Sequence, residues 1–373
     1  MKDTVYGREA EWLSVSFVAG AAAGAIALRG IGNGASRFAA ASAAASAAVC
    51  LLAFMAAKGR RRSFPAAAGF WGIAVAAFAC GLFCVLNDAL PGVGPARPPG
   101  MLRRTASAAA GYLQGVISRI PFPDPHTEPL LRAIILGDRS LLDADTVRSF
   151  RDSGSSHLLA LSGLHMGVIY VIFTRLAAFT GNFPAARTIR YAVTVALSAF
   201  YTIMTGSSPS TVRAFLFILM NESLRILGRR RSALKVLCAS LTLQLAARPS
   251  SIASAGFQLS YLAMAGIFIL HPPLSALYRG GRWDPMKKAW DAATLALSCQ
   301  IATAPAAWLH FRSFPAYFLI ANMTAVPVTT IFVAVSVLTI ALSAAGLCPY
   351  ALVRADGAIA SLLLRIVETI GSM

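Results

Sequence analysis

The chain has 373 residues, of which 57% are hydrophobic and only 13% are charged. A soluble globular domain carries about 25% charged residues, so this composition excludes an ordinary soluble protein and indicates an integral membrane protein. The 33 Lys and Arg residues outnumber the 15 Asp and Glu residues, for a formal charge of +18. Basic cytoplasmic loops explain much of such an excess, and binding of an acidic polymer could use the remainder.

Long apolar segments recur along the chain, separated by Pro, Gly and Arg. This pattern favours helices over a β-barrel, and it predicts an all-α, polytopic membrane bundle of about 11 transmembrane helices, several of them short for a bilayer. The predicted spans cover residues 12–28, 38–57, 66–86, 157–178, 190–206, 212–227, 233–247, 254–271, 290–309, 318–345 and 348–370.

Basic residues set the predicted orientation of this bundle. Clusters of Lys and Arg occur at residues 58–62, 229–235 and 279–288. Because such clusters stay in the cytoplasm, one consistent threading satisfies all three and places the N-terminus inside.

The segment 87–156 is the longest stretch that falls between predicted spans, and this orientation places it outside. Residues 91–100 are rich in Pro and Gly and indicate a linker. Residues 101–120 predict a basic amphipathic helix on the outer membrane surface. Residues 142–153 predict a second surface helix, with Ser140 and Asp143 as a capping box. We expect the two helices to brace the opening of the fourth span.

The opening of that fourth span carries an unusual set of polar residues. His157, Ser162 and His165 lie within an apolar run, where polar groups are costly unless they face a partner or a wet cavity. Gly163 and Gly167 form a small-xxx-small pair, which lets another helix approach closely. The set indicates a lined path; the alternative is a tight helix crossing with satisfied histidines.

The next informative block runs from Gly206 to Ala214. Pro209 suits the first position of a helix, and Arg213 then falls near its positive end, where a cation is locally unfavourable. Helix N-terminal amides with an arginine would suit a phosphate group, whereas the alternative is an arginine that reaches the outer lipid headgroups. The candidate cap residues are Ser207, Ser208 and Ser210.

Three uncharged polar residues fall in later spans, namely Gln258, Gln300 and Asn322. Pro305 and Pro327 should interrupt their helices and free backbone carbonyl groups, which is tolerated only against protein or a watery cavity. These residues could line a route of moderate polarity, or each could simply join two helices by hydrogen bonds.

The motifs together resemble the ComEC family, the inner-membrane channel proteins of natural competence. One block joins Leu136-Gly-Asp-Arg-Ser140, with Gly137, Asp138 and Arg139, to the run from His157 to His165. Three more follow in the family's order: 205–214, 256–261, and 300–305 with 322–327. The resemblance covers about residues 128–345. It implies a bacterial inner-membrane channel that passes single-stranded DNA.

The resemblance and the spans suggest four regions. They are N-terminal transmembrane helices at 1–86, an external linker and amphipathic helix at 87–127, a competence channel domain at 128–345, and a C-terminal transmembrane helix at 346–373.

ComEC proteins commonly carry an oligonucleotide-binding domain and a metallo-β-lactamase-like domain, and neither is expected here. The segment 87–156 is too short for the first domain, and no room follows residue 373 for the second. The five histidines contain no His-x-His-x-Asp-His cluster. We therefore expect a channel core that is not an enzyme and that uses no metal and no cofactor.

The leading hypothesis is a channel for single-stranded DNA in the inner membrane. Its expected partners are that DNA, membrane lipids, and separate DNA-receptor, nuclease or cytoplasmic translocase subunits. The sequence has no phosphate-binding Gly-x-x-x-x-Gly-Lys loop, so energy would come from a partner or a gradient. The alternatives are a transporter of a small anionic solute or lipid, and a non-conducting membrane scaffold.

Overall fold

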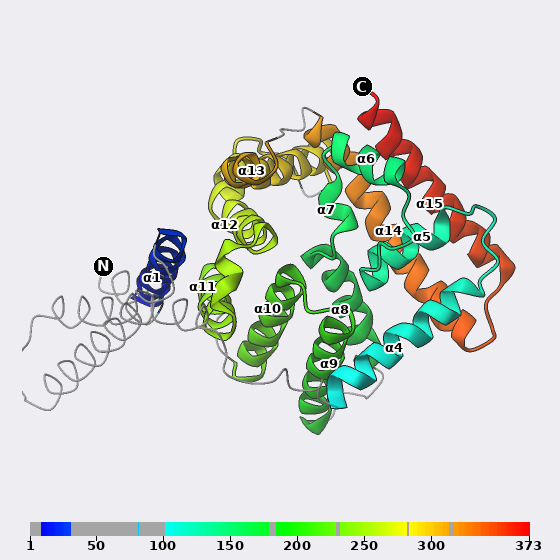
Figure 1. Ribbon diagram of the computed structural model, residues 1–373, viewed down its shortest axis with the longest axis horizontal. Coiled ribbons are helices and arrows are strands. Elements are labelled where there is room, and N and C mark those ends of the chain that lie inside the picture. The colour runs from blue at the N-terminus through cyan, green and yellow to red at the C-terminus, as the bar shows by residue number, and fades with distance from the viewer. Residues whose placement is uncertain are drawn as a thin grey trace, which may run out of the picture. The chain divides into compact units, whose positions relative to one another are not determined.

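The structure is a computed structural model, and every regular element in its described residues is a helix (Figure 1). This confirms the all-α prediction for that part of the chain. The predicted spans at 38–57 and 66–86 and the predicted linker at 91–100 lie outside the described residues, apart from Gly81. The described residues are 9–30, 81, 101–178, 184–228, 232–281, 283–312 and 317–373.

The chain divides into two compact units. The first comprises residues 1–97 with 230–261, and the second comprises 98–229 with 262–373. In the first unit, α1 (Glu9–Gly30) packs against α11 (Ala233–Ala247) and the 3-10 helix η3 (Pro249–Ala253). α12 (Ala255–Ser275) begins in this unit and ends in the second.

The second unit holds most of the described helices and both predicted surface helices. Its elements are α4 (Met101–Ser118), α5 (Thr127–Leu131), the π-helix η1 (Arg132–Leu136), α6 (Ala144–Asp152), α7 (Ser156–Leu159), α8 (Gly163–Ala177), α9 (Pro184–Met204), α10 (Pro209–Ile226), α13 (Pro285–Phe311), α14 (Phe318–Ala344) and α15 (Tyr350–Gly371).

One apolar core joins the elements before α8 to the last two helices of the chain. α14 and α15 pack along each other, α6 and α5 pack on α15, and α4 packs on both α9 and α14. The fully buried members of this core include Ile117, Leu130, Phe150, Phe332 and Leu363. The segment predicted to brace the mouth from the surface therefore shares a core with the C-terminal helices, because its apolar residues need a buried face.

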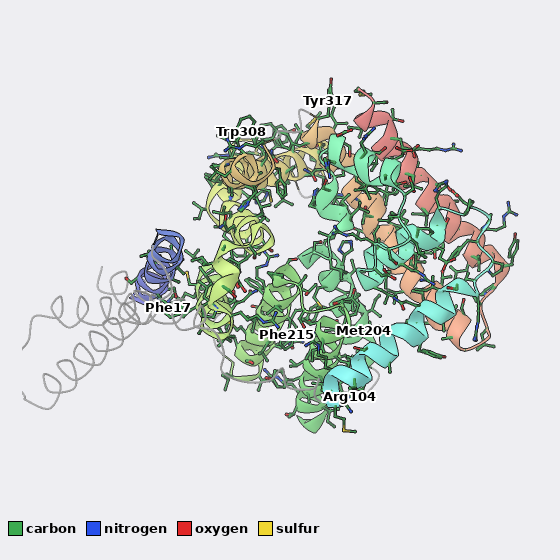
Figure 2. All side chains as sticks on the ribbon, in the orientation of Figure 1. Phe17, Arg104, Met204, Phe215, Trp308 and Tyr317 are labelled. Atoms are coloured by element: carbon green, nitrogen blue, oxygen red, sulfur yellow. The ribbon has the colours of Figure 1, made fainter. Side chains whose placement is uncertain are left out.

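A second, smaller apolar cluster lies between α8, α9 and α10. It contains Leu161, Met166, Ile169 and Tyr201, all buried. Met204, labelled in Figure 2, ends α9 and packs against both clusters. The two clusters thereby hold α8 and α9 against the core around α14.

Among the described residues, three helices are long and apolar enough to cross a membrane. They are α12 with 21 residues and α13 and α14 with 27 each. α8 and α11 are apolar but have only 15 residues each. α15 was predicted to be a span, but it does not reach that apolarity because it carries charged residues such as Arg354 and Arg365 on an exposed face.

Three local predictions were wrong. The predicted span at 157–178 is broken, since α7 ends at Leu159 and α8 begins at Gly163. Pro305 and Pro327 do not interrupt their helices, because α13 and α14 continue through both at the loss of one backbone hydrogen bond each.

The third wrong prediction concerns the start of α6. Its N-cap is Asp143, whose side chain accepts a hydrogen bond from the Thr146 amide at 2.8 Å. Ser140 takes no part in the cap, because its hydroxyl donates to Asp138 Oδ1 at 2.7 Å. Gly154, with φ +77°, follows the end of the helix.

Candidate functional site

The break before α8 is the point where the predicted site residues gather. Residues 160–162 are not helical, and Ser162 caps α8 by accepting a hydrogen bond from the Leu164 amide at 3.2 Å. His165 Nδ1 in turn accepts a hydrogen bond from the Ser162 amide at 3.1 Å. The pair forms a capping box in which histidine takes the place of the usual Glu or Gln.

His165 is fully buried behind this cap. Because Nδ1 accepts the Ser162 hydrogen, the neutral imidazole carries its own hydrogen on Nε2. That Nε2 atom is buried and has no hydrogen-bond partner among the residues that the structure describes. A buried donor without a partner is costly, so His165 offers one hydrogen bond to a group that reaches it.

Two backbone carbonyl groups at the break are bonded by side chains from distant motif blocks. Arg139 Nε donates to the Leu159 carbonyl at 3.1 Å, and Ser210 Oγ donates to the Leu161 carbonyl at 2.8 Å. Unwound backbone in a membrane protein needs such partners or water. The blocks around residues 137, 160 and 210 therefore form one structural unit.

Gly137 lies where the same three blocks meet. It follows the π-helix η1 with φ +75°. A Cβ atom on it would lie 2.6 Å from Leu161 Cδ1 and 3.8 Å from the Thr205 carbonyl oxygen. The position thus needs glycine both for its left-handed backbone and for its space. Tyr201 on α9 donates its hydroxyl hydrogen to the carbonyl of Ile135 in η1 at 2.7 Å.

Asp138 and Arg139 do not pair with each other. Asp138 accepts hydrogen bonds from the hydroxyl and amide of Ser140 and from Gln114 Nε2 of α4 at 2.9 Å. The Ser140 hydroxyl and amide, assisted by Arg132, hold the pKa of the Asp138 carboxyl below its ordinary value. Asp138 therefore fastens the loop after η1 to α4.

The turn before α10 matches its prediction closely. Gly206 has φ +82° and Ser207 has φ +53°. Ser208 is the N-cap and accepts a hydrogen bond from the Thr211 amide at 3.3 Å, and Pro209 is the first helical residue. Ser210, a candidate cap, instead bonds the break before α8.

Arg213 lies beside the first residue of α8. Its side chain is buried, with the residue 8% exposed, and a Cβ atom on Gly163 would lie 3.0 Å from Arg213 Nη2. The guanidinium group thus packs against protein at the start of α8. Gly163 provides the space for the guanidinium group, whereas the Cβ position of Gly167 faces open space, with no atom of the described residues within 4 Å.

A close helix approach occurs instead at Gly266, which the sequence reasoning did not select. A Cβ atom there would lie 2.4 Å from the Ser298 carbonyl oxygen of α13. The signal available in the sequence was a lone glycine in an apolar span, which is too common to single out one position.

The remaining predicted polar residues lie on four different helices, and His157 is near enough to His165 to interact with it electrostatically. His157 is exposed on α7. Gln258 belongs to the first unit, where its Nε2 donates to the Ile252 carbonyl at 2.8 Å. Gln300 on α13 and Asn322 on α14 are half-buried.

Two buried carboxylates lie on α10 and α15, and the spacing of Glu222 and Arg225, three residues apart, predicts from the sequence that these two pair. Glu222 on α10 accepts a hydrogen bond from the Tyr170 hydroxyl at 2.5 Å and lies 3.6 Å from Arg225 Nη1. Asp356 on α15 is fully buried and accepts a hydrogen bond from Ser336 Oγ of α14 at 2.8 Å. The sequence reasoning missed Asp356, and a carboxylate inside an apolar helix is itself the signal that could have found it. Among the described residues, no group of three or more His, Cys, Asp or Glu side chains is placed to hold a metal ion.

The apolar helices and the competence motifs define a helical membrane protein. Residues 134–373 match the family model described as "Competence protein". This match spans more than half of the chain, so the chain belongs to the Competence protein family, and the resemblance to ComEC proteins is confirmed.

Curated relatives agree with this assignment. ComE operon protein 3 of Bacillus subtilis (strain 168) is 27% identical over 216 residues, which are 55% of this chain and 25% of that protein. Competence protein ComA of Neisseria gonorrhoeae is 30% identical over 173 residues, 45% of this chain and 25% of that protein. The uncharacterized protein YcaI of Escherichia coli (strain K12) is 23% identical over 244 residues, which are 62% of this chain and 31% of that protein.

The matches to these three relatives therefore cover between a quarter and a third of their length. No solved structure matches the chain significantly.

Proposed function

We propose that the chain forms the core of a channel that passes single-stranded DNA across the bacterial inner membrane during natural transformation. The observation that carries this proposal is the break before α8. Its carbonyl groups are held by Arg139 and Ser210, and its start lies against the buried Arg213. In membrane proteins, unwound backbone of this kind is tolerated where it is buried in protein or lines a water-filled cavity.

The chemistry of the break suits a nucleic-acid phosphate. The amides at the start of α8 carry partial positive charge, and the guanidinium group of Arg213 adds a full one. The buried Nε2 of His165 supplies a further donor. Phosphate contacts of this kind bind DNA irrespective of its sequence, as a route for any transforming strand requires.

Polar groups on neighbouring helices would continue such a route. Gln300 and Asn322 are half-buried amides on α13 and α14, two of the helices long enough to span a bilayer. Among the residues that the structure describes, neither side-chain amide hydrogen-bonds to a neighbouring helix, and this supports a role in lining the route over a role in joining helices.

The proposal includes a topology. About 11 spans with the N-terminus in the cytoplasm would place all three basic clusters inside, as the charge rule requires. α15, with 22 residues, would complete the set as a helix whose charged face meets protein or headgroups. The channel would act without catalysis of its own, with separate receptor, nuclease or translocase subunits supplying the remaining steps of uptake.

The experiment is a transformation assay in a strain that lacks this gene, complemented with variants of the full chain. Arg213→Gln should lower transformation at least tenfold, whereas the matched control Arg148→Gln, an exposed arginine on α6, should leave it unchanged. Arg213→Lys should recover part of the transformation, because lysine keeps the positive charge but lacks the planar guanidinium group that binds a phosphate through two hydrogen bonds. Immunoblots of the membrane fraction check that each variant accumulates.

Undiminished transformation in the Arg213→Gln strain would contradict the DNA route. A small-anion carrier would show itself separately, as vesicle flux of an anionic solute that depends on Arg213 and is not reduced by added single-stranded DNA.

A further inference from the structure

The connection between α12 and α13 carries a cluster of exposed aromatic, apolar and basic side chains. α12 ends at Ser275 and α13 begins at Pro285, and both helices are long and apolar enough to cross a bilayer. A short connection between two consecutive spans lies at a membrane surface. Its side chains are therefore matched to the region of lipid headgroups.

Hydrogen bonds hold this connection in a defined shape. The Tyr278 hydroxyl donates to Asp284 Oδ2 at 2.9 Å, while Asp284 Oδ1 caps α13 by accepting from the Met286 amide at 2.9 Å. The indole Nε1 of Trp290 donates to the Leu274 carbonyl at 3.0 Å. The segment is thus organised before any partner arrives, which lowers the entropy cost of binding.

The two acidic residues of the connection are engaged in these bonds and in an ion pair, whereas two of its basic side chains are exposed. Asp284 serves as the cap of α13, and Asp291 lies 2.7 Å from Lys287 Nζ in an ion pair. Arg279 and Lys288 are exposed. The sequence 276–291 contains four Lys or Arg residues against these two Asp residues, so the segment carries net positive charge.

Large apolar side chains are exposed beside these cations. Trp283 is 83% exposed, Leu277 is 73% exposed and Met286 is 62% exposed. The ammonium group of Lys288 lies 5.7 Å from the centroid of the Trp283 ring. Trp next to a basic side chain is the combination that favours the membrane–water interface, where an amphipathic ring meets acyl chains and a cation meets phosphate.

We propose that residues 277–281 and 283–288 form an interfacial binding site for anionic phospholipid. Trp283, Leu277 and Met286 enter the boundary between headgroups and acyl chains, and Arg279 and Lys288 bind the lipid phosphate. The site anchors the connection between two spans, and it holds whether or not the chain conducts DNA.

The test measures which lipid surrounds Trp283. The full chain contains five tryptophans, and Phe at the other four leaves Trp283 as the only fluorophore. The protein is placed in phosphatidylcholine vesicles that contain either brominated phosphatidylglycerol or brominated phosphatidylcholine, and quenching by bromine reports contact. Each basic residue near an anionic surface strengthens association about fivefold. Quenching by the anionic lipid should therefore begin at a several-fold lower mole fraction.

The double variant Arg279→Gln/Lys288→Gln should remove this preference. The matched control is a second single-tryptophan protein, which keeps Trp308, labelled in Figure 2, and has Phe at the other four positions. Trp308 lies at the other end of α13 and is 51% exposed. Its quenching should not change with the two substitutions, which also shows that the variant remains folded in the bilayer.

Three outcomes would overturn the proposal. Trp308 could be quenched while Trp283 is quenched by neither lipid, which would place the segment away from the bilayer. Equal quenching of Trp283 by both lipids would remove the anionic selectivity. Protection of Trp283 by a single-stranded oligonucleotide, with exclusion of lipid, would make the segment a nucleic-acid surface instead.

Discussion

The substitution Gly137→Ala tests whether the motif blocks are assembled as the structure places them. The new methyl group meets two separate costs. The left-handed backbone at φ +75° costs a residue with a Cβ about 1–2 kcal/mol. The 2.6 Å approach to Leu161 Cδ1 forces local repacking, which costs about 1–3 kcal/mol more. The total loss of unfolding free energy is therefore roughly 2–5 kcal/mol.

Matched glycines separate the two costs. Gly206 has φ +82° and open space at its Cβ position, so Gly206→Ala should show the backbone cost alone. Gly115 lies inside α4 with nothing within 4 Å of its Cβ position, so Gly115→Ala should be neutral or stabilising by up to about 1 kcal/mol. The order of stability should be Gly115→Ala, then Gly206→Ala, then Gly137→Ala.

The assay is reversible unfolding by sodium dodecyl sulfate in mixed micelles, with Leu161→Ala as the partner in a double-mutant cycle. Loss of Leu161 Cδ1 and Cγ removes the overlap, so the Gly137→Ala/Leu161→Ala pair should show a favourable coupling of about 1–3 kcal/mol. A wild-type stability for Gly137→Ala, or a cycle with no coupling, would refute the placement of Gly137 against the break before α8.

Two further substitutions test the bonds around the same break. Ser210→Ala leaves the Leu161 carbonyl without its donor and should cost about 1–3 kcal/mol in the same assay, whereas Ser210→Thr should retain most of it; equal stability of all three proteins would contradict the bond. Asp138 has a lowered pKa in the folded chain, so its bonds add stability above the ordinary value of 3.8, and this contribution is lost as pH falls through the folded pKa. Asp138→Asn should flatten the pH dependence of unfolding in that acidic window, and an unchanged pH profile would show that the carboxylate is not bonded there.

Local sequence determines most helix bounds in the second half of the chain. The predicted span at 233–247 coincides with α11, and the span at 318–345 differs from α14 by one residue. These segments are mainly apolar and are followed two residues later by Pro249 and Gly346, so composition alone locates them. The Ser208 cap and Pro209 at the start of α10 follow from equally local preferences.

Contacts between distant residues decided what local sequence could not. Nothing in the apolar run after His157 marks the break before Gly163, because its supporting donors, Arg139 and Ser210, lie 20 and 49 residues from their acceptors. The sequence also does not determine the direction of the Arg213 side chain, since an arginine at this helix position could either reach the lipid headgroups or be buried in protein.

Competition between neighbours explains the smaller errors. Ser140 and Asp143 are both good cap residues. Asp143 is the N-cap of α6, because the Ser140 hydroxyl is bonded to Asp138 instead. The surface segment 101–152 looked separate because its helices are amphipathic. Its apolar faces pack against α14 and α15, more than 170 residues later in the chain.

The central claim is that water reaches the break before α8 from outside the cell membrane. The direct measurement replaces the six native cysteines, places single cysteines at Ala160 and Ser162, and exposes cells to a membrane-impermeant thiol reagent. Both positions are half-buried, and Ser140 in the exposed loop after η1 serves as the reactive control. We expect both cysteines at the break to react, more slowly than the control. Reaction at Ser140 with none at either break position would show that the break is sealed inside protein and lines no channel.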